Sequence, residues 1–219
     1  MSKMLVICPT KGRPKNALRL SQHFYDTRVG DTDLTFCIDN DDETAHEYME
    51  TVLYYSKGPA KRLGPWLNEK AREQGHNYDI IGFLGDDVIP RTDGWDDLVR
   101  DAMQPNGIVY CNDGWQGEGL PTGVFMDAKM IDKAGYMVYP ELVHLYIDNH
   151  WKAWGEALGT LTYLPNVHLE HMHPFAGKAE TDDVYEAANA PDMYTKDGQA
   201  FMKFIEWELG PLTERVLNG

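Results

Sequence analysis

Residues 4–14 read MLVICPTKGRP, and this stretch decides the fold. Its first five residues form a continuous apolar run that Pro9 ends, a pattern typical of a strand buried on both faces of a parallel sheet. After a short polar turn, Pro14 suits the first position of a helix, which we expect to run to about Tyr25. The buried face of that helix would carry Ala17, Leu20 and Phe24.

Two more apolar runs follow at a similar spacing. They are residues 34–38 and 80–84, and each ends in a polar cluster, residues 39–43 and 85–87. Predicted helices, one of them over residues 65–74, separate the runs. Strands that alternate with helices predict an open, mostly parallel α/β sheet flanked by helices. Ligands of such sheets bind beyond the carboxyl ends of the strands, where the polar clusters lie.

The second half of the chain is less regular. Residues 113–119 are rich in glycine and fit either a flexible rim of a binding site or a plain surface turn. An acidic tail over about 177–191 precedes a last amphipathic helix. The other predicted elements are strands at 108–110, 123–126 and 160–164 and a helix over 148–158.

Charge and composition limit the class of partner. The 219 residues include 20 Lys and Arg against 35 Asp and Glu, so the formal net charge is -15. This charge repels polyanions, and nucleic acid and anionic membranes are not expected as main partners. No apolar run approaches the roughly 20 residues that a bilayer requires. Three cysteines outside any paired spacing predict reduced thiols and a cytoplasmic location; they are Cys8, Cys37 and Cys111.

Asp86 and Asp87 directly follow the run at 80–84, which fixes two carboxylates at the edge of the sheet. Mg²⁺ and Mn²⁺ are commonly held by one or two carboxylates together with a substrate diphosphate. The structural alternative is a turn in which an Asp caps the next helix. The pair therefore predicts either a divalent cation site or a helix cap.

Histidines near the end of the predicted sheet offer further ligands. On an extended chain every second side chain faces the same side, so His171 and His173 share a face and His168 lies on the other. One or both could complete the cation site, and a histidine beside carboxylates slightly favours Mn²⁺ over Mg²⁺. Taken singly, each histidine also suits a core or surface position.

A set of short motifs carries a family resemblance. The motifs are VICPTKGRP at 6–14, Asp39, Lys57-Gly58 with Asn68, FLGDD at 83–87 and EHMHPFAGK at 170–178. In this order and spacing they resemble GT-A glycosyltransferases near family 2, particularly small members encoded by bacteriophages. The resemblance implies a single Rossmann-like GT-A domain over 1–219. Its parts would be a nucleotide-sugar half at about 1–105, an acceptor and metal half at about 106–180, and a C-terminal tail and helix at 181–219.

The resemblance also implies an activity, the metal-dependent transfer of a sugar from a nucleotide-diphosphate sugar to an acceptor that the sequence does not identify. Asp87 would contact Mn²⁺ or Mg²⁺, and His171 or His173 would assist it. The family usually has Asp-x-Asp or Asp-Asp-Asp where this chain begins with Gly85. The donor-binding residues would be Pro9, Thr10, Arg13, Asp39, Lys61, Asn68, Asp86 and Lys178.

Asp148 is the candidate general base. Related enzymes place a carboxylate near the start of a late helix, and residues 146–150 read YIDNH. An Asp at such a position equally suits a helix N-cap. Aromatic faces suit the apolar side of a sugar ring, which makes Trp115, Tyr146 and Trp151 acceptor candidates. Trp151 shares a helix face with Trp154, so helix packing is its alternative.

Two other functions remain open. A sugar nucleotidyltransferase would share the α/β core and the cation, although the first turn lacks the glycine-rich basic loop of that class. A non-catalytic carbohydrate- or nucleotide-binding protein could keep the same fold. Metal-dependent binding of a nucleoside diphosphate would separate the transferase from the non-catalytic protein.

Overall fold

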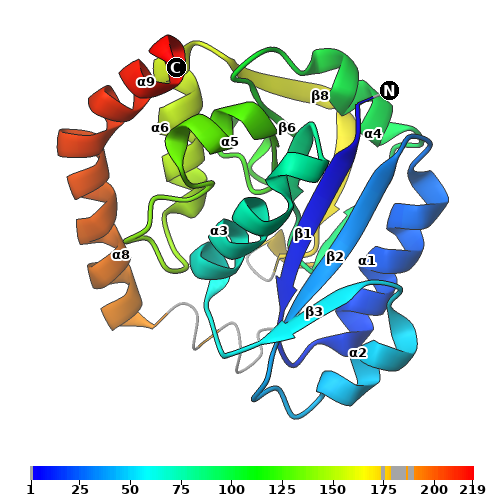
Figure 1. Cartoon of the computed structure of the whole chain (residues 1–219). Coiled ribbons are helices and arrows are strands. Elements are labelled where there is room, and N and C mark those ends of the chain that lie inside the picture. Colours follow the sequence, from blue (N-terminus) through cyan, green and yellow to red (C-terminus); the bar gives the residue numbers. More distant parts are fainter. Residues whose placement is uncertain (1, 174–175, 179–185, 187–189) are drawn as a thin grey trace.

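A central sheet with helices on both faces organises the chain (Figure 1). The computed structural model describes residues 2–173, 176–178, 186 and 190–219. The strands are β1 (Met4–Thr10), β2 (Thr32–Asp39), β3 (Tyr55–Gly58), β4 (Ile80–Phe83), β5 (Val88–Pro90), β6 (Ile108–Asn112), β7 (Val124–Asp127) and β8 (Leu161–His171). The α-helices are α1 (Pro14–Thr27), α2 (Ala45–Thr51), α3 (Leu63–Gln74), α4 (Trp95–Ala102), α5 (Ala128–Ala134), α6 (Ile147–Leu158), α8 (Pro191–Lys203) and α9 (Leu209–Asn218).

The strand order is β3-β2-β1-β4-β7-β6-β8-β5. Strands β3, β2, β1 and β4 run parallel to one another, which confirms the predicted α/β sheet. Strand β7 is antiparallel to both β4 and β6, so the sheet is mixed rather than purely parallel. Because β1 lies between β2 and β4, the polar residues after these three strands meet at one edge.

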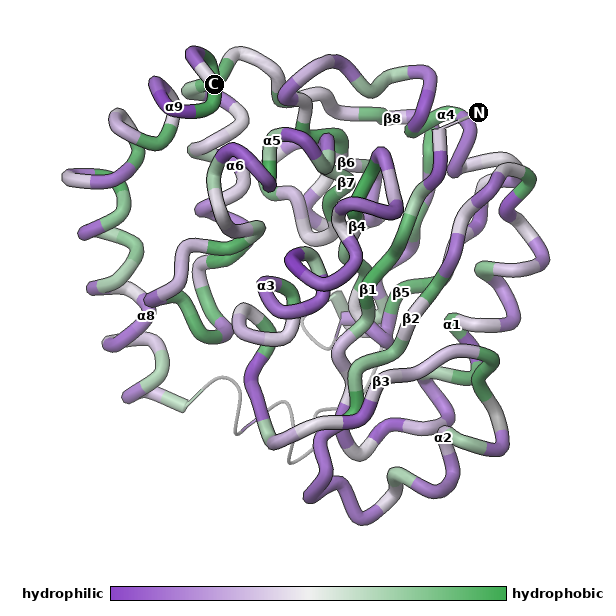
Figure 2. Tube along the Cα trace, viewed as in Figure 1, coloured by the Kyte–Doolittle hydropathy of each residue, from purple (hydrophilic) through white to green (hydrophobic). Residues whose placement is uncertain are grey.

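Strand β1 is buried on both faces, as its apolar run predicted. Leu5 and Ile7 face a core that α3, α5 and α6 cover, whereas Val6 and Cys8 face a second core under α1, α2 and α4. Figure 2 shows this apolar centre along β1 and the hydrophilic surfaces of the surrounding helices. Burial of both faces fixes the register of β1, because a slip by one residue would exchange the two cores.

Strand β8 is longer than predicted. The expected strand ended at residue 164, but β8 continues past Pro165 to His171. The pairing of β8 with the neighbouring strand β6 shifts register between Cys111, opposite Leu164, and Asn112, opposite His168. This shift lets β8 continue past Pro165. The last part of β8 then pairs with β5, with His171 opposite Val88. The histidines therefore lie on a paired strand beside the turn that carries Asp87.

Several short elements were not predicted. Strand β3 is a half-exposed edge strand without an apolar run, and β5 has only three residues. Asp127 is the N-cap of α5, where its side chain accepts a hydrogen bond from the Lys129 N–H, and Gly135 is the C-cap, with φ of 84°. These cap and stop signals were present in the sequence and could have identified α5.

The C-terminal helices form an arm on the side of the molecule away from α1 and α2 (Figure 1). A π-helical turn over residues 204–208 joins α8 to α9, and Phe204 is fully buried there. The predicted tail at 177–191 falls mostly outside the described residues. Among the residues that the structure describes, no helix combines the length and apolar character that crossing a bilayer needs.

Candidate active site

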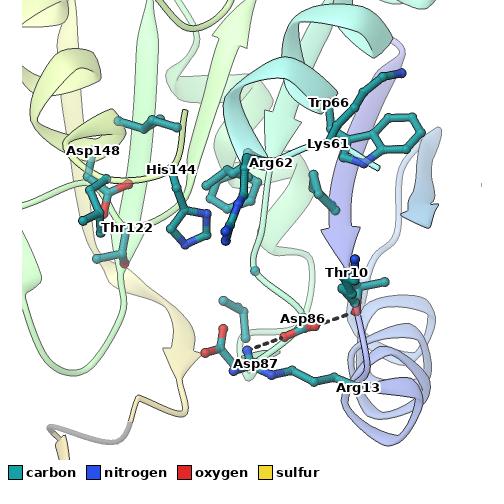
Figure 3. Close-up of a pocket in the computed structure, with 18 of the residues that line it drawn as sticks. Thr10, Arg13, Lys61, Arg62, Trp66, Asp86, Asp87, Thr122, His144 and Asp148 are labelled. Atoms are coloured by element: carbon teal, nitrogen blue, oxygen red, sulfur yellow. Dashed lines mark hydrogen bonds and ion pairs between the residues drawn. The ribbon is translucent and has the colours of Figure 1, made fainter. Parts of the chain in front are cut away.

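A cavity of about 780 Å³ opens beyond the carboxyl ends of β1, β2 and β4. Figure 3 shows two walls, with Thr10, Lys61 and Trp66 on one side and Thr122, His144 and Asp148 on the other. The predicted site residues that line the cavity are Pro9, Thr10, Arg13, Asp39, Lys61, Asp86, Asp87, Tyr146, Asp148, His171 and His173. Residues from distant parts of the chain thus meet where sheet topology places a ligand.

Asp86 lies at the floor of the cavity and is 6% exposed. The Thr10 hydroxyl donates a 2.6 Å hydrogen bond to it, and the Arg13 guanidinium lies 3.5 Å away (Figure 3). Burial and the negative charge of Asp87 raise the pKa of Asp86 to about 6, against the opposing effects of Arg13 and Thr10. Ionisation of Asp86 therefore costs free energy despite Thr10 and Arg13. A bound cation or a further hydrogen-bond donor would reduce that cost.

Asp87 faces a histidine. Its Oδ2 lies 3.3 Å from Nε2 of His171. Burial raises the pKa of Asp87, but the hydrogen bond and charge of His171, together with Arg13, outweigh burial and hold it below its usual value. Burial lowers the pKa of His171, and Asp87, Asp148 and Asp113 together raise it above its ordinary value. Each residue therefore favours the charged form of the other, and we call the two the Asp87–His171 pair.

The turn before this pair explains the glycine in the motif. A Cβ on Gly85 would lie 2.7 Å from Oδ1 of Asp87, too close for any side chain without movement of that carboxylate. The turn leads into strand β5 and not into a helix, so the helix-cap alternative for Asp86 and Asp87 is wrong. Gly85 thus replaces the first family carboxylate at a position where a side chain would displace the Asp87 carboxylate.

Asp39 ends β2 and is 5% exposed. Its Oδ1 accepts hydrogen bonds from the Lys61 backbone N–H at 2.9 Å and from Trp66 Nε1 at 2.8 Å. Lys11 Nζ lies 3.4 Å from Oδ2. Lys61 Nζ lies 4.1 Å from the centroid of the Trp66 ring and also pairs with Glu69. Helix α3 and the segment before it therefore form one wall around the Asp39 carboxylate.

Asp148 lies in the first turn of α6 and lines the opposite wall (Figure 3). Burial raises its pKa to about 7; the Asp113 charge reinforces this shift and the His171 charge opposes it. The N-cap of α6 is Tyr146, which makes no side-chain capping bond. The alternative that Asp148 caps the helix is therefore wrong. A carboxylate that titrates near neutral pH has the proton affinity of a general base or acid.

Helix α8 anchors this wall. The buried Asp197 accepts backbone N–H bonds from three consecutive residues, Val143, His144 and Leu145, at 3.3, 2.8 and 2.7 Å. Tyr146 follows with φ of 59°, a backbone conformation uncommon for an aromatic residue. Its ring stacks on Phe201 of α8, with centroids 5.7 Å apart. Tyr146 thus lines the cavity on a segment that the C-terminal helix holds in place.

Four predicted site residues lie elsewhere. Trp151 is fully buried, donates to the Met137 carbonyl at 3.0 Å, and does not reach the cavity, so its prediction as an acceptor residue is wrong. Asn68 is also wrong as a donor residue, because its side chain binds the backbone of Met137 and Val138 at 2.7 to 2.9 Å. Lys178 pairs with Glu170 at 3.0 Å outside the cavity lining.

Trp115 is the fourth residue outside the cavity lining. It is 39% exposed, and its ring stacks on His173 with centroids 4.2 Å apart and an interplanar angle of 16°. Since His173 does line the cavity, Trp115 lies behind its rim. The predicted acceptor residue Trp115 therefore contacts the cavity through the His173 ring and does not line it directly.

The sequence did not identify several residues that line the cavity: Trp66, Thr122 and His144. Burial and the positive charge of Arg62 lower the pKa of His144 to about 4, so this ring is neutral at physiological pH. Arg62 directly precedes α3 and contributes a guanidinium group to the cavity, in addition to that of Arg13.

The Asp87–His171 pair fits a divalent cation. In the described part of the chain, no three His, Cys, Asp or Glu side chains converge on one point. Two protein ligands nevertheless match the usual mode of Mg²⁺ and Mn²⁺, which take their remaining ligands from substrate phosphates and water. Nδ1 of His171 is buried without a hydrogen bond, and Nε2 points at Asp87, so the ring presents one nitrogen to the cavity.

No protein-family model matches the sequence, and no curated protein sequence matches it. Solved structures do match. The Pyrobaculum calidifontis mannosyltransferase PcManGT, in complex with GDP-Man and Mn²⁺, has a TM-score of 0.64 and 11% identity over 99% of this chain and 73% of its own. Mycobacterium tuberculosis glucosyl-3-phosphoglycerate synthase, in complex with Mn²⁺, UDP and phosphoglyceric acid, has a TM-score of 0.60 and 10% identity over 92% and 78%.

A cytidylyltransferase from Leptospira borgpetersenii also matches, with a TM-score of 0.51 and 14% identity over 75% of each chain. At such identities, similarity establishes the fold and leaves the substrate open. The mixed, mostly parallel sheet and its covering helices are therefore those of the GT-A glycosyltransferase structures, and the chain has this fold.

Proposed function

We propose that this protein is a metal-dependent glycosyltransferase that moves a sugar from a nucleotide-diphosphate sugar to an acceptor hydroxyl. The observation that carries the proposal is the composition of the cavity. The cavity is lined by the guanidinium groups of Arg13 and Arg62, by the Asp87–His171 pair and by Asp148. The guanidinium groups would bind the diphosphate, the Asp87–His171 pair would bind the cation, and Asp148 would act as the base.

The donor would bind along the ends of β1 and β2. Oδ1 of Asp39 already accepts from the Lys61 N–H and Trp66 Nε1, so Oδ2, which has Lys11 Nζ at 3.4 Å, would accept a further hydrogen bond from the base or ribose. Arg13 and Arg62 would compensate the diphosphate charge in a chain that is otherwise strongly acidic. Pro9 and Thr10 would lie against the nucleoside on the same wall.

Asp87 and His171 would hold Mn²⁺ or Mg²⁺. The cation supplies positive charge to the leaving nucleoside diphosphate. Asp148, across the cavity, would accept the proton of the acceptor hydroxyl. Its pKa of about 7 suits this task, because a base is most effective when its pKa lies near the working pH.

Calorimetric titration tests the donor half of the proposal. UDP, GDP, CDP and dTDP are each titrated with Mn²⁺ and again with EDTA. We expect one nucleotide to bind tightly only with Mn²⁺, and Asp87→Ala to abolish that binding. Asp127→Asn is a matched control, because Asp127 also binds backbone N–H groups but lies outside the cavity lining. Absence of binding to every nucleotide would favour a non-catalytic protein.

A sugar nucleotidyltransferase is the second candidate, because the cytidylyltransferase also matches the fold. The two activities differ in their products. Incubation with a panel of nucleotide sugars should release nucleoside diphosphate, with water as the acceptor when no other is present. Incubation with nucleoside triphosphates and sugar phosphates should release no pyrophosphate. Release of pyrophosphate without release of nucleoside diphosphate would favour the nucleotidyltransferase over the glycosyltransferase.

A further inference from the structure

A second cavity, of about 700 Å³, lies beside the later turns of α6. Two tyrosines contribute to its lining, Tyr110 of β6 and Tyr163 of β8, which are opposite each other in the parallel pairing of these strands. Their ring centroids are 5.0 Å apart, with an interplanar angle of 34°. Both rings pack on the side of the sheet that α6 covers, so the cavity lies over a face of the sheet.

The glycine-rich loop between β6 and β7 forms another wall of the second cavity, through Glu118 and Gly119. The buried carboxylate of Asp113 accepts three backbone N–H bonds from this loop, at 2.8 to 2.9 Å. The Tyr110 hydroxyl donates a 2.9 Å bond to the Glu118 carbonyl. The loop, which the sequence left open as a rim or a plain turn, is therefore tied down at the edge of a cavity.

The two cavities share these walls. On α6, Asp148 lines the first cavity, whereas Lys152 and Glu156 line the second, and a spacing of four residues puts all three along one side of the helix. On the loop, Thr122 lines the first cavity and Gly119 the second. The helical rise places Glu156 about 12 Å from Asp148 along the axis. A ligand that contacts both ends must therefore be longer than a single sugar ring.

The side chains of the second cavity suit a carbohydrate. A tyrosine offers an apolar ring face and a hydroxyl, which match the apolar face and the hydroxyl groups of a sugar. Lys152 Nζ donates to the Gly119 carbonyl at 2.7 Å, and an ammonium group has three donors, so it can also bind a ligand hydroxyl. The carboxylates of Glu118 and Glu156 can accept from further hydroxyls.

Two other classes of ligand suit the second cavity less well. Its two glutamates against one lysine leave an excess of negative charge, in a chain whose formal net charge is -15, and this charge repels an anion. Extended peptides commonly bind by adding a strand to a free sheet edge. Strand β6 is paired on both sides, with β7 and β8, and the cavity lies over its face. A neutral glycan is therefore the favoured ligand.

We propose that the second cavity binds the distal sugar units of a neutral oligosaccharide acceptor, whose terminal hydroxyl lies at Asp148. This inference rests on the proposed function and specifies the class of its acceptor. The oligosaccharide runs along α6, with a sugar ring against Tyr163 and its hydroxyls at Lys152 and the glutamates. The binding energy of the distal units then positions the hydroxyl that receives the new sugar.

An NMR titration without metal or donor tests binding, with ¹⁵N introduced only at glycine. The probes are neutral oligomers of glucose, galactose, mannose and N-acetylglucosamine, from single sugars to hexasaccharides. With the longer members of one series we expect shifts of the Gly119, Gly155 and Gly159 amides, which line the second cavity, and none of Gly30, which lines neither cavity.

Two comparison ligands test the class, an oligogalacturonate as the anionic glycan and a neutral serine-rich peptide. Neither should shift the three glycine amides of the second cavity. Absence of these shifts with every neutral oligosaccharide, or shifts with the oligogalacturonate or the peptide alone, would overturn the inference.

Variants of the lining test the contacts. Tyr163→Ala and Lys152→Ala should each weaken binding of the oligosaccharide about fivefold, the effect of one ring contact or one hydrogen bond. Tyr54→Ala is the control, because Tyr54 is an exposed tyrosine outside both cavity linings. Lys152 is on the partly exposed surface of α6, so its variant keeps the test open if Tyr163→Ala fails to fold. Unchanged affinity in the folded variants would overturn the inference.

Transfer rates connect the second cavity to the reaction. With a nucleotide sugar as donor, kcat/KM for the hexasaccharide should exceed that for the single sugar about tenfold or more, because the distal units contribute binding energy. In Lys152→Ala this ratio should fall toward one. Equal kcat/KM for both lengths in the wild type would overturn the inference. Absence of turnover with every nucleotide sugar, even with water as acceptor, would instead reject the proposed function, while the glycine shifts would still identify a glycan site.

Discussion

The Thr10 hydroxyl and the Asp86 carboxylate, 76 residues apart in the chain, share a hydrogen bond of 2.6 Å at the ends of β1 and β4. This contact joins the first motif of the sequence to the paired carboxylates and holds Asp86 in place beside Arg13. Because hydrogen bonds to a carboxylate favour its charged form, the contact partly offsets the burial that raises the pKa of Asp86.

Replacement of Thr10 by Val should therefore raise the pKa of Asp86 above its present value of about 6. Loss of one hydrogen bond of about 1 kcal/mol should also weaken nucleotide binding roughly fivefold. Carbon-13 NMR titration of the Asp86 carboxyl measures the first effect and calorimetry the second. Thr213→Val in α9 is the control, since its hydroxyl donates to the Leu209 carbonyl of its own helix. An unchanged Asp86 titration would contradict the prediction.

Asp148→Asn should separate binding from turnover. Removal of a general base costs about 10² to 10⁴ in rate, whereas the donor side lies on the opposite wall and should keep its affinity within twofold. Donor turnover and Mn²⁺-dependent nucleotide binding are measured on the same preparation. Normal turnover in this variant would remove Asp148 from the mechanism.

The same residue predicts a pH profile. A base with a pKa of about 7 is protonated in acid, so kcat should fall tenfold per pH unit well below pH 7 and level off above it. The substrate-saturated rate, measured from acid to alkaline pH, checks this. A flat profile across neutral pH would show that a different group governs the rate.

Asp148 should also make the ligand-free protein less stable in alkali. Its pKa is raised from 3.8 to about 7 on folding, so the folded state favours the protonated form. The stabilisation is fully present below the unfolded pKa and is lost as the pH rises through 7. Asp148→Asn should thus raise Tm relative to wild type above pH 7 and leave the difference small near pH 4. Differential scanning calorimetry at both values tests the sign.

His150 predicts instability in acid. It is fully buried, neither ring nitrogen has a described hydrogen-bond partner, and burial lowers its pKa from 6.5 to about 3. The unfolded chain therefore binds a proton that the folded state excludes, and stability is lost as the pH falls from about 6.5 toward 3. His150→Leu should reduce the fall in Tm between pH 7 and pH 5, whereas a change of the exposed His76 to Gln should not. An equal fall in both variants would contradict this.

The sequence predicted the site best where a strand end fixes a side chain. Asp39, Asp86 and Asp87 follow buried apolar runs, and adjacent parallel strands bring such ends together whatever the surrounding helices do. Gly85 is a departure from the family pattern, but its close approach to the Asp87 carboxylate appears only in three dimensions.

The sequence predicted the site less well where the packing of a helix determines whether a side chain reaches the cavity. Periodicity showed that Trp151 and Trp154 share a face of α6, yet it could not show that this face packs in the core. Asn68 had the motif position of a donor residue, but its partners are backbone groups 69 and 70 residues away. Arg62 and Thr122 reach the cavity through the packing of α3 and of the loop after β6, which local sequence does not encode.

The bonds from residues 143–145 to Asp197 bear on how the protein is made. Chains emerge from the ribosome with the N-terminus first, and N-terminal units fold before later ones. Strands β1, β2 and β4 can pair early, but three backbone N–H groups of the opposite wall have no carboxylate until α8, 52 to 54 residues later, has been synthesised. A nascent chain would therefore complete the side formed by β1, β2 and β4 first, and the wall that carries Asp148 would become ordered only after α8 has been synthesised.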